Sequence, residues 1–297
     1  MPSTKIDRSG EPPVTVIDSH LHLWDPRLLD YPWLAQVPGL RRSYLPADLS
    51  TATAGLGSGG FHLEAVVFVE AGRTDADADA EVDWVEQLAA EWPMLRAMVA
   101  HVPLERGADT GARIAALRRH RLVTGVRRNL QDEADGFTTT DDFVAGVRLL
   151  GEAGLSFDLC VRHHQLPEVT ALAARVPEVT FVLDHLGKPP VAVGDTAQWR
   201  DDLARMAQLP NVVCKLSGLA TESSRGWLGH DLLPYLDHAL RHFGPDRCLF
   251  GGDWPVATLA TGYRRWLGVV RAACAELSEP HRQSVFADTA RRVYRID

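Results

Sequence analysis

Eight short apolar runs recur along the chain, and each is separated from the next by a longer amphipathic segment. The runs are nearly continuous stretches of apolar residues, as in Ala65-Val66-Val67-Phe68-Val69. Continuous apolarity is typical of parallel strands that are buried on both faces. We therefore predict eight strands, over residues 14–18, 64–70, 95–101, 122–127, 156–162, 179–184, 211–217 and 247–252.

The segments between these runs have the periodicity of helices, and the alternation decides the fold class. We expect helices over residues 78–91, 109–120, 138–153, 165–175, 196–208, 229–243 and 261–275. Eight strands alternating with helices favour a closed parallel α/β barrel of the (β/α)8 (TIM barrel) type, with an open doubly wound sheet as the alternative. A length of 297 residues suits one such barrel, so we predict a single domain over residues 1–297.

Charge, hydropathy and cysteine usage restrict the partners and the compartment. The net charge is −8 and no Lys/Arg-rich block is present, which argues against nucleic acid as a partner. No apolar stretch approaches the roughly 18–20 residues of a membrane span. Residues 1–13 are polar, contain Pro12-Pro13 and lack a signal-peptide core, so we expect a disordered or extended segment there. We interpret Cys160, Cys214, Cys248 and Cys274 as reduced thiols of a cytoplasmic protein.

Two histidines follow the first predicted strand, and a carboxylate follows the last. His20 and His22 are separated by one residue, so they point the same way from a strand end. Imidazoles placed like this can share a metal ion or a reacting water molecule. Asp253 follows the final strand after a glycine pair. If the first and last strands are neighbours in a closed barrel, these three side chains meet.

The other predicted strands also end in polar or titratable residues. In (β/α)8 enzymes the active site is built at the C-terminal ends of the strands. Exposed strand ends are often polar for solubility alone, but the preference for His, Arg and Asp over Ser, Thr and Asn favours a site. The groups at these ends are His20, His22, Glu70, His101, Arg127, Arg162, His185, Lys215, Ser217 and Asp253.

The alternation of side chains within the strands supports the same prediction. Barrel interiors are lined by alternate residues. Asp18, His20 and His22 share one face of the first strand, Lys215 shares a face with Val213, and Asp253 shares one with Leu249. If these faces point inward, one mouth of the barrel collects imidazoles, cations and a carboxylate.

Asp253 and His185 are the strongest candidates for the chemical step. A carboxylate near imidazoles can take a proton from water and return it to a leaving group. Asp253 could instead cap the following turn, which contains Trp254-Pro255. His185 could be a metal ligand or a donor that polarises a carbonyl group, or it could be a buried histidine bonded to the backbone.

Other candidates would bind the substrate. Guanidinium groups suit oxygen-rich ligands, so Arg127 and Arg162 are predicted to orient the substrate, with structural ion pairs as the alternative. Trp24 and Trp33, in a long loop over residues 24–46, could form an apolar wall against a sugar ring, although core packing explains them nearly as well.

Four separated motifs resemble the amidohydrolase superfamily, and most closely its amidohydrolase 2 branch. They are the segments 17–24, 184–189, 215–219 and 252–255, and Gly125-Val126-Arg127 and Tyr31-Pro32-Trp33-Leu34 also fit. That branch contains lactonases of the L-fuconolactonase, L-rhamnonolactonase and 2-pyrone-4,6-dicarboxylate lactonase types. The resemblance implies a distorted (β/α)8 barrel and hydrolysis by an activated water molecule.

The resemblance also implies roles for individual residues. The strand-one pair carries over to His20 and His22, the strand-six histidine to His185 and the strand-eight acid to Asp253. Strand four ends in Arg127 without the Lys or Glu that bridges two metals in binuclear relatives, so we do not expect a two-metal site. These four residues would hold one divalent ion, zinc or manganese, or would act without a metal, since both cases occur in the branch.

We therefore predict a hydrolase that opens a small lactone ring, most simply a sugar-acid lactone. Asp253 would activate water, His20, His22 and His185 would polarise the carbonyl group or bind the metal, and Lys215 would help to orient the substrate. One alternative is a metal-dependent decarboxylase of an aromatic or muconate-type acid. Another is a barrel that binds a sugar acid without catalysis. The sequence does not define the oligomeric state.

Overall fold

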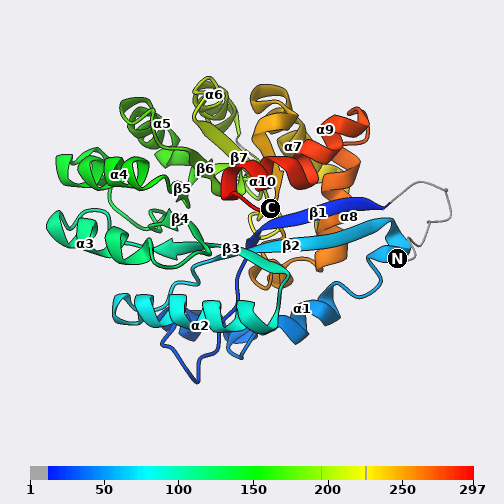
Figure 1. The fold of residues 1–297 in the computed structure, drawn as a ribbon. Coiled ribbons are helices and arrows are strands. Elements are labelled where there is room, and N and C mark those ends of the chain that lie inside the picture. The colour runs from blue at the N-terminus through cyan, green and yellow to red at the C-terminus, as the bar shows by residue number, and fades with distance from the viewer. Residues whose placement is uncertain (1–12, 195, 225) are drawn as a thin grey trace.

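The computed structural model describes residues 13–194, 196–224 and 226–297. Its strands form one parallel eight-stranded sheet in chain order, which curves into a nearly closed barrel (Figure 1). This confirms the predicted (β/α)8 class. The strands are β1 (Val14–Leu21), β2 (Phe61–Val69), β3 (Leu95–His101), β4 (Val123–Arg127), β5 (Ser156–Leu159), β6 (Phe181–Leu183), β7 (Val212–Leu216) and β8 (Cys248–Phe250).

The first and last strands approach each other where the predicted site residues lie. Leu21 forms a parallel bridge with Trp254. The amide of Asp253 donates to the carbonyl oxygen of His20 at 2.8 Å, and the amide of His22 donates to that of Trp254 at 2.8 Å. Backbone hydrogen bonds at this seam therefore fix Asp253 beside the two histidines.

Helices cover the outside of the barrel and follow the predicted ranges closely. Amphipathic faces pack on the strands because each helix has an apolar stripe that must be buried. The ring consists of α2 (Ala78–Glu91), α3 (Ala108–Leu117), α4 (Asp141–Ala153), α5 (Leu166–Arg175), α6 (Ala197–Met206), α7 (Gly229–Phe243) and α8 (Tyr263–Ala273). Shorter helices are α1 (Pro46–Ala52), α9 (Glu279–Gln283) and α10 (Thr289–Tyr294).

The barrel interior has its own small core, separate from the layer between strands and helices. Val67, Val99, Val213 and Leu249 belong to this inner cluster, together with Tyr294 from α10. Helix α10 contacts β1 and β8, and it lies over the barrel in Figure 1. The C-terminal helix therefore contributes side chains to the inside of the barrel.

Strand β1 departs from simple alternation, and this corrects one prediction. The pairing of β1 with β2 shifts register after Val16 and again after Asp18. Such bulges change which face a side chain occupies. Asp18 therefore points toward α8, where its carboxylate accepts from Tyr263 Oη at 2.9 Å and from the Gly252 amide at 2.7 Å. His20 lies on the inner side as predicted, but Asp18 does not share that face.

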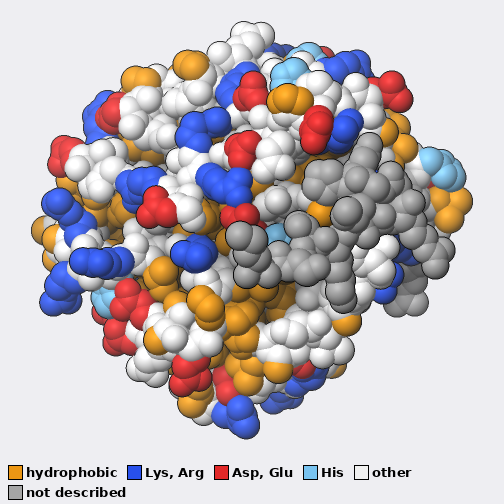
Figure 2. All heavy atoms as spheres, turned by 45° about the vertical axis from the view of Figure 1, so that its right-hand side comes forward, with side chains coloured by type: hydrophobic (Ala, Val, Ile, Leu, Met, Phe, Trp, Pro, Cys, Tyr) orange, Lys and Arg blue, Asp and Glu red, His pale blue; other side chains and the backbone are white. Residues whose placement is uncertain are grey.

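Several predictions concern the surface and the chain termini. Within the described residues, no helix combines the length and apolarity needed to cross a membrane. Figure 2 shows positive and negative side chains interspersed over the face in view. Cys160, Cys214, Cys248 and Cys274 are buried free thiols. The extended segment predicted over residues 1–13 lies outside the described residues except for Pro13.

Candidate active site

Three imidazoles and one carboxylate converge at the C-terminal ends of the strands. His20 and His22 come from the end of β1, His185 follows β6 and Asp253 follows β8. The Nε2 atoms of His20 and His22 are 3.1 Å apart. Asp253 Oδ1 lies 3.8 Å from each of those atoms and 4.0 Å from His185 Nε2. The barrel therefore brings together the four residues predicted to carry the chemistry.

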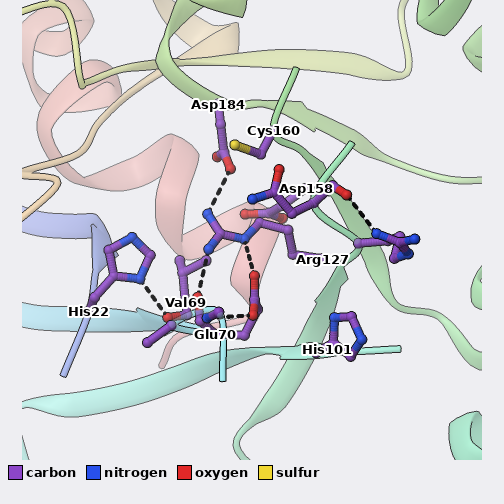
Figure 3. Close-up of polar contacts among 12 residues, drawn as sticks. His22, Val69, Glu70, His101, Arg127, Asp158, Cys160 and Asp184 are labelled. Atoms are coloured by element: carbon purple, nitrogen blue, oxygen red, sulfur yellow. Dashed lines mark hydrogen bonds and ion pairs between the residues drawn. The ribbon is translucent and has the colours of Figure 1, made fainter. Parts of the chain in front are cut away.

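The second nitrogen of each ring has a partner of its own. His22 Nδ1 lies 2.8 Å from the carbonyl oxygen of Val69, an interaction drawn in Figure 3. His185 Nδ1 lies 2.8 Å from Ser217 Oγ. His20 Nδ1 lies 3.2 Å from Asp184 Oδ1. These contacts orient the rings so that every Nε2 atom is directed at Asp253, the arrangement by which outer partners fix metal-binding histidines.

Burial determines the protonation of the cluster. Burial, assisted by the positive charge of Arg127, lowers the pKa of His22 from 6.5 to about 3. Burial likewise holds the pKa values of His20 and His185 well below 6.5. Burial raises the pKa of Asp253 from 3.8 to about 7. The three imidazoles are therefore neutral at neutral pH, the state in which a ring nitrogen can ligate a metal.

The residues fit one divalent cation. A carbonyl oxygen only accepts, so His22 Nδ1 carries the proton and its Nε2 presents a lone pair toward His20. In a tetrahedral zinc site with Zn–N distances of ~2.0–2.1 Å, neighbouring ligand atoms lie about 3.3 Å apart. His20, His22 and Asp253 have separations of this order, and His185 could complete the set. The donor set of imidazoles and a carboxylate suits zinc.

A second grouping, of His20, Asp184 and His185, is less suited to a cation. Asp184 already forms ion pairs with two buried cations. Lys215 Nζ lies 3.0 Å from Asp184 Oδ1, and Arg127 Nη1 lies 3.4 Å from Oδ2. Burial favours the neutral carboxyl, but the positive charge of Lys215 and the interaction with His20 outweigh it and hold the pKa of Asp184 well below 3.8. Asp184 therefore serves the site as an anion that orients His20.

Lys215 lies beneath the site, not at its surface. Its ammonium is fully buried and pairs with Asp158 Oδ2 at 2.5 Å as well as with Asp184. It also lies 3.1 Å from His20 Nδ1. Asp158 accepts in turn from Tyr294 Oη of α10 at 2.8 Å. The predicted contact of Lys215 with a substrate is not supported by this position, because its donors are directed at carboxylates and at His20.

Arg127 reaches the cavity but is largely committed to two anions. Its Nε donates to Glu70 Oε1 at 2.8 Å, and its Nη2 donates to the Glu70 carbonyl oxygen at 2.6 Å. Figure 3 shows the guanidinium between Glu70 and Asp184. The ion pair that was the alternative for Arg127 is therefore present, and only part of its donor capacity faces the cavity.

A cavity of ≈ 330 Å³ opens above these residues. Five predicted site residues line it, namely His22, Trp33, Arg127, His185 and Asp253. Trp24 is fully buried, donates to the Arg42 carbonyl oxygen at 2.8 Å and packs edge-on against Trp33, so it supports the wall from behind. Arg162 pairs with Asp132 at 2.9 Å and is not among the lining residues.

Sequence reasoning did not single out several polar lining residues. Lys188 lies within a motif used for the family resemblance, and its place three residues after His185 is the signal that could have found it. The others lie in loops whose conformation the pattern does not define. The missed residues are Asn129, Gln131, Asp132, Lys188 and Thr221.

Comparison with known proteins identifies the family. The family model described as Amidohydrolase matches residues 17–296. Two proteins named L-fucono-1,5-lactonase are 39% and 33% identical to the chain, from Burkholderia multivorans and Burkholderia ambifaria respectively. The first alignment covers 94% of this chain and 96% of that protein, and the second covers 95% and 96%.

A solved structure agrees with this match. The crystal structure of an amidohydrolase from Burkholderia multivorans with bound zinc superimposes with a TM-score of 0.85 at 38% sequence identity, covering 95% of this chain and 100% of that one. The bound zinc of that structure accords with the ligand set described above. The sequence match, the barrel and the strand-end cluster together show that this chain belongs to the amidohydrolase family.

Proposed function

We propose that the protein hydrolyses a sugar-acid lactone, and that Asp253 activates the attacking water. The observation that carries the proposal is the convergence of three neutral imidazoles on Asp253 Oδ1 at the floor of a polar cavity. The two Burkholderia relatives named L-fucono-1,5-lactonase support a lactone as the substrate.

The chemistry follows from the position of the carboxylate. Asp253 takes one proton from water while the water oxygen forms a bond to the lactone carbonyl carbon. The bond between that carbon and the ring oxygen then breaks, and Asp253 returns its proton to the departing ring oxygen. The products are a carboxylate, formed by loss of a proton to solvent, and a free hydroxyl group on the same molecule.

The histidines hold the reacting groups in place. When a divalent cation is bound, it supplies a Lewis acid that polarises the carbonyl oxygen and acidifies water. His20, His22 and His185 would be its neutral ligands, and the contacts of their Nδ1 atoms fix each ring before substrate arrives. Such preorganisation lowers the barrier because no reorientation is needed during the reaction.

A panel of lactones tests this proposal. The purified protein, with zinc and with manganese in separate series, is incubated with neutral aldonolactones and with pyrone and muconate lactones in a pH-indicator assay. Release of acid from the aldonolactones is the expected result. Release of carbon dioxide from an aromatic or muconate-type acid, with no acid released from any lactone, would contradict the proposal and favour the decarboxylase alternative.

A further inference from the structure

The chain leaves β6 through four consecutive residues in the left-handed region of backbone space. The φ angles are 53° at His185, 55° at Leu186, 67° at Gly187 and 49° at Lys188. This conformation is costly for residues that carry a Cβ atom, and it rarely continues beyond a single residue. Strain of this kind persists where the surrounding structure enforces it, and it concentrates at functional sites.

Contacts from neighbouring elements hold this left-handed turn in place. Trp199 of α6 donates its indole N–H to the Leu186 carbonyl oxygen at 2.8 Å. At Gly187 a Cβ atom would lie only 2.7 Å from Leu166 Cδ2. The amide of Lys188 donates to the His185 carbonyl oxygen at 2.9 Å. The turn is thus built into the packing of the barrel.

The consequence of the turn is that two side chains reach the same cavity. Residues three apart in a tight helical turn lie on the same side. His185 and Lys188 both line the cavity. His185 belongs to the cluster around Asp253, whereas Lys188 forms no ion pair with Asp253 within 4.0 Å and lowers its pKa through its positive charge. The strained backbone therefore fixes the spacing between a group of the reaction centre and a cation on the cavity wall.

Lys188 differs from the other cations near the cavity in its partners. Its ammonium donates to Gln131 Oε1. Among the described residues no carboxylate lies within 4.0 Å of it, whereas Arg127 and Arg162 each have an acidic partner. Burial lowers the pKa of Lys188, but nearby negative groups outweigh this effect and the net shift is upward, so the side chain is charged. An ammonium has three donors, and the contact with Gln131 uses one.

We propose that Lys188 is a substrate-binding residue that donates to a hydroxyl oxygen of the lactone, with Gln131 holding it in position. This inference rests on the proposed lactonase function and specifies its substrate class. The class is a lactone with free hydroxyl groups and no carboxylate substituent. Asn129 and Thr221, which also line the cavity, offer both donors and acceptors to such hydroxyls.

The charges around Lys188 favour a neutral substrate over an anionic one. Asp132 and Asp253 line the same cavity as this single ammonium. A carboxylate on the substrate would meet these anions, and Arg127 is already paired with Glu70 and Asp184. A hydroxyl group avoids this repulsion because it can accept from Lys188 and donate to an acidic side chain.

The test compares variants on matched substrates. Wild type, Lys188→Met, Lys188→Arg and Gln131→Leu are assayed on the aldonolactone that is hydrolysed fastest, on its monodeoxy analogues and on a lactone that carries a ring carboxylate. Arg148→Met removes an exposed cation from α4 and serves as the control. Metal content and thermal unfolding are measured for every variant, which separates loss of the contact from loss of the fold or of the metal.

Lys188→Met is expected to raise KM for the aldonolactone by about 10- to 100-fold, as for a lost charged hydrogen bond that acts on binding alone. At a pH high enough to ionise Asp253 in both proteins, kcat should be nearly unchanged, because the charge of Lys188 otherwise lowers the pKa of Asp253. Wild type should disfavour one monodeoxy analogue, and Lys188→Met should treat that analogue and the parent alike. Lys188→Arg should restore part of the affinity. Gln131→Leu should also raise KM. This variant tests the contact between Lys188 and Gln131 even if Lys188→Met does not fold.

Three results would overturn the assignment. One is an unchanged KM in both Lys188→Met and Gln131→Leu, and another is a fall in kcat alone, which would place Lys188 in the chemical step. The third is a wild-type preference for the carboxylated lactone that is lost in Lys188→Met, which would make the ligand a carboxylate. If wild type hydrolyses no lactone, the proposed function fails first, and the assignment of a lactone to Lys188 fails with it.

Discussion

The Nε2 atoms of His20 and His22 lie 3.1 Å apart while the Nδ1 atom of each ring contacts a different strand or loop. His22 must present a lone pair at this contact, because its Nδ1 proton is held by the Val69 carbonyl oxygen. His20 Nδ1 lies 3.1 Å from Lys215 Nζ, which can only donate, so the His20 proton lies on Nε2 and is directed at the His22 lone pair. A cation bound to both Nε2 atoms would move this proton to Nδ1, where Asp184 Oδ1 lies 3.2 Å away. The geometry of these two rings thus connects metal binding to the local stability of β1.

Removal of the metal is therefore expected to lower both activity and stability. Protein loaded with zinc should unfold at a higher temperature than chelated protein, since a ligand at 1,000 times its Kd stabilises the folded state by about 4 kcal/mol. Differential scanning calorimetry and metal analysis measure this. His22→Ala should bind less zinc than wild type. Equal unfolding temperatures and equal activity with and without chelator would show that the histidines act without a metal.

Replacement of Asp253 by Asn should abolish turnover and retain the fold. The amide cannot accept a proton from water, and loss of a general base typically costs ~10²–10⁴-fold in rate. Steady-state kinetics with circular dichroism as a check on folding provide the measurement. Asp201→Asn, which changes an exposed carboxylate of α6 away from the cavity, is the matched control. Activity of Asp253→Asn within about tenfold of wild type would exclude its assignment as the base.

Gly218→Ala should impair catalysis through His185. A Cβ atom at this position would lie 2.4 Å from His185 Nδ1, where the ring contacts Ser217, and the φ of 66° strains any larger residue. The imidazole must move away from Asp253, so kcat should fall by more than tenfold, in line with the sensitivity of rates to misplacement by about 1 Å. Gly194→Ala also has a positive φ but meets no atom within 4 Å, and it serves as the control in the same assay.

The buried pairs of Lys215 should contribute more to stability than the contact of Tyr294. Lys215→Met leaves the Asp158 carboxylate without a cation and leaves Asp184 paired with Arg127 alone, and breaking a buried pair from one side costs ~3–5 kcal/mol. Tyr294→Phe removes one hydrogen bond to Asp158 and should cost about 1 kcal/mol. Urea unfolding of both variants checks the order, and a smaller loss for Lys215→Met than for Tyr294→Phe would contradict it.

Glu81 should make stability depend on pH. Burial raises its pKa from 4.5 to about 8, although Arg73 lies nearby and opposes the shift. The folded state then holds a proton that the unfolded state releases, so this contribution is complete below pH 4.5 and is lost as the pH rises toward 8. Glu81→Gln removes this titration and should keep the acceptor for the Ala71 amide.

The free energy of unfolding of wild type, relative to Glu81→Gln, should therefore fall by at least ~1 kcal/mol between pH 5 and pH 8. Chemical unfolding at both pH values gives this difference. A relative stability that stays constant or rises over the interval would show that Glu81 is ionised in the folded protein.

Much of the fold was predictable because the apolar pattern of most segments matches the strand or helix that they form. The helices over 78–91 and 229–243 have the predicted bounds, since their apolar stripes are bounded by clear breaks in the pattern. Strands β5 and β6 end three residues and one residue earlier than predicted. Past the end of β5 the apolar run continues through Cys160 and Val161, which are buried outside the strand, so apolarity alone does not mark where strand pairing ends.

The C-terminal helices α9 and α10 were not predicted. Helix α10 contacts β1 and β8 and supplies Ala290 and Tyr294 to the inner core, whereas α9 has no buried residue. Helices this short have little intrinsic signal and depend on tertiary contacts. The bulges of β1, which turn Asp18 toward α8, also depend on pairing with β2. Both features arise from tertiary contacts that a periodic pattern does not contain.

Site residues that follow directly from strand ends were predictable, whereas those whose position depends on loop conformation were less so. His20, His22 and Asp253 converge because parallel strands place their C-terminal ends together. The sequence pattern does not show how far along a strand a residue lies from the cavity. The position of Lys215 below the cavity was therefore not predicted. Gln131 and Lys188 depend on loop conformation, and their contact required the structure.

The contacts from Tyr294 through Asp158 to Lys215 determine when the site can be complete during synthesis of the chain. Asp253 is supplied by the strand that closes the barrel, and the support beneath His20 is complete only once residue 294 has left the ribosome. A nascent chain therefore carries no assembled reaction centre. A purification tag joined on the C-terminal side of α10 would have to leave Tyr294 free to enter the barrel.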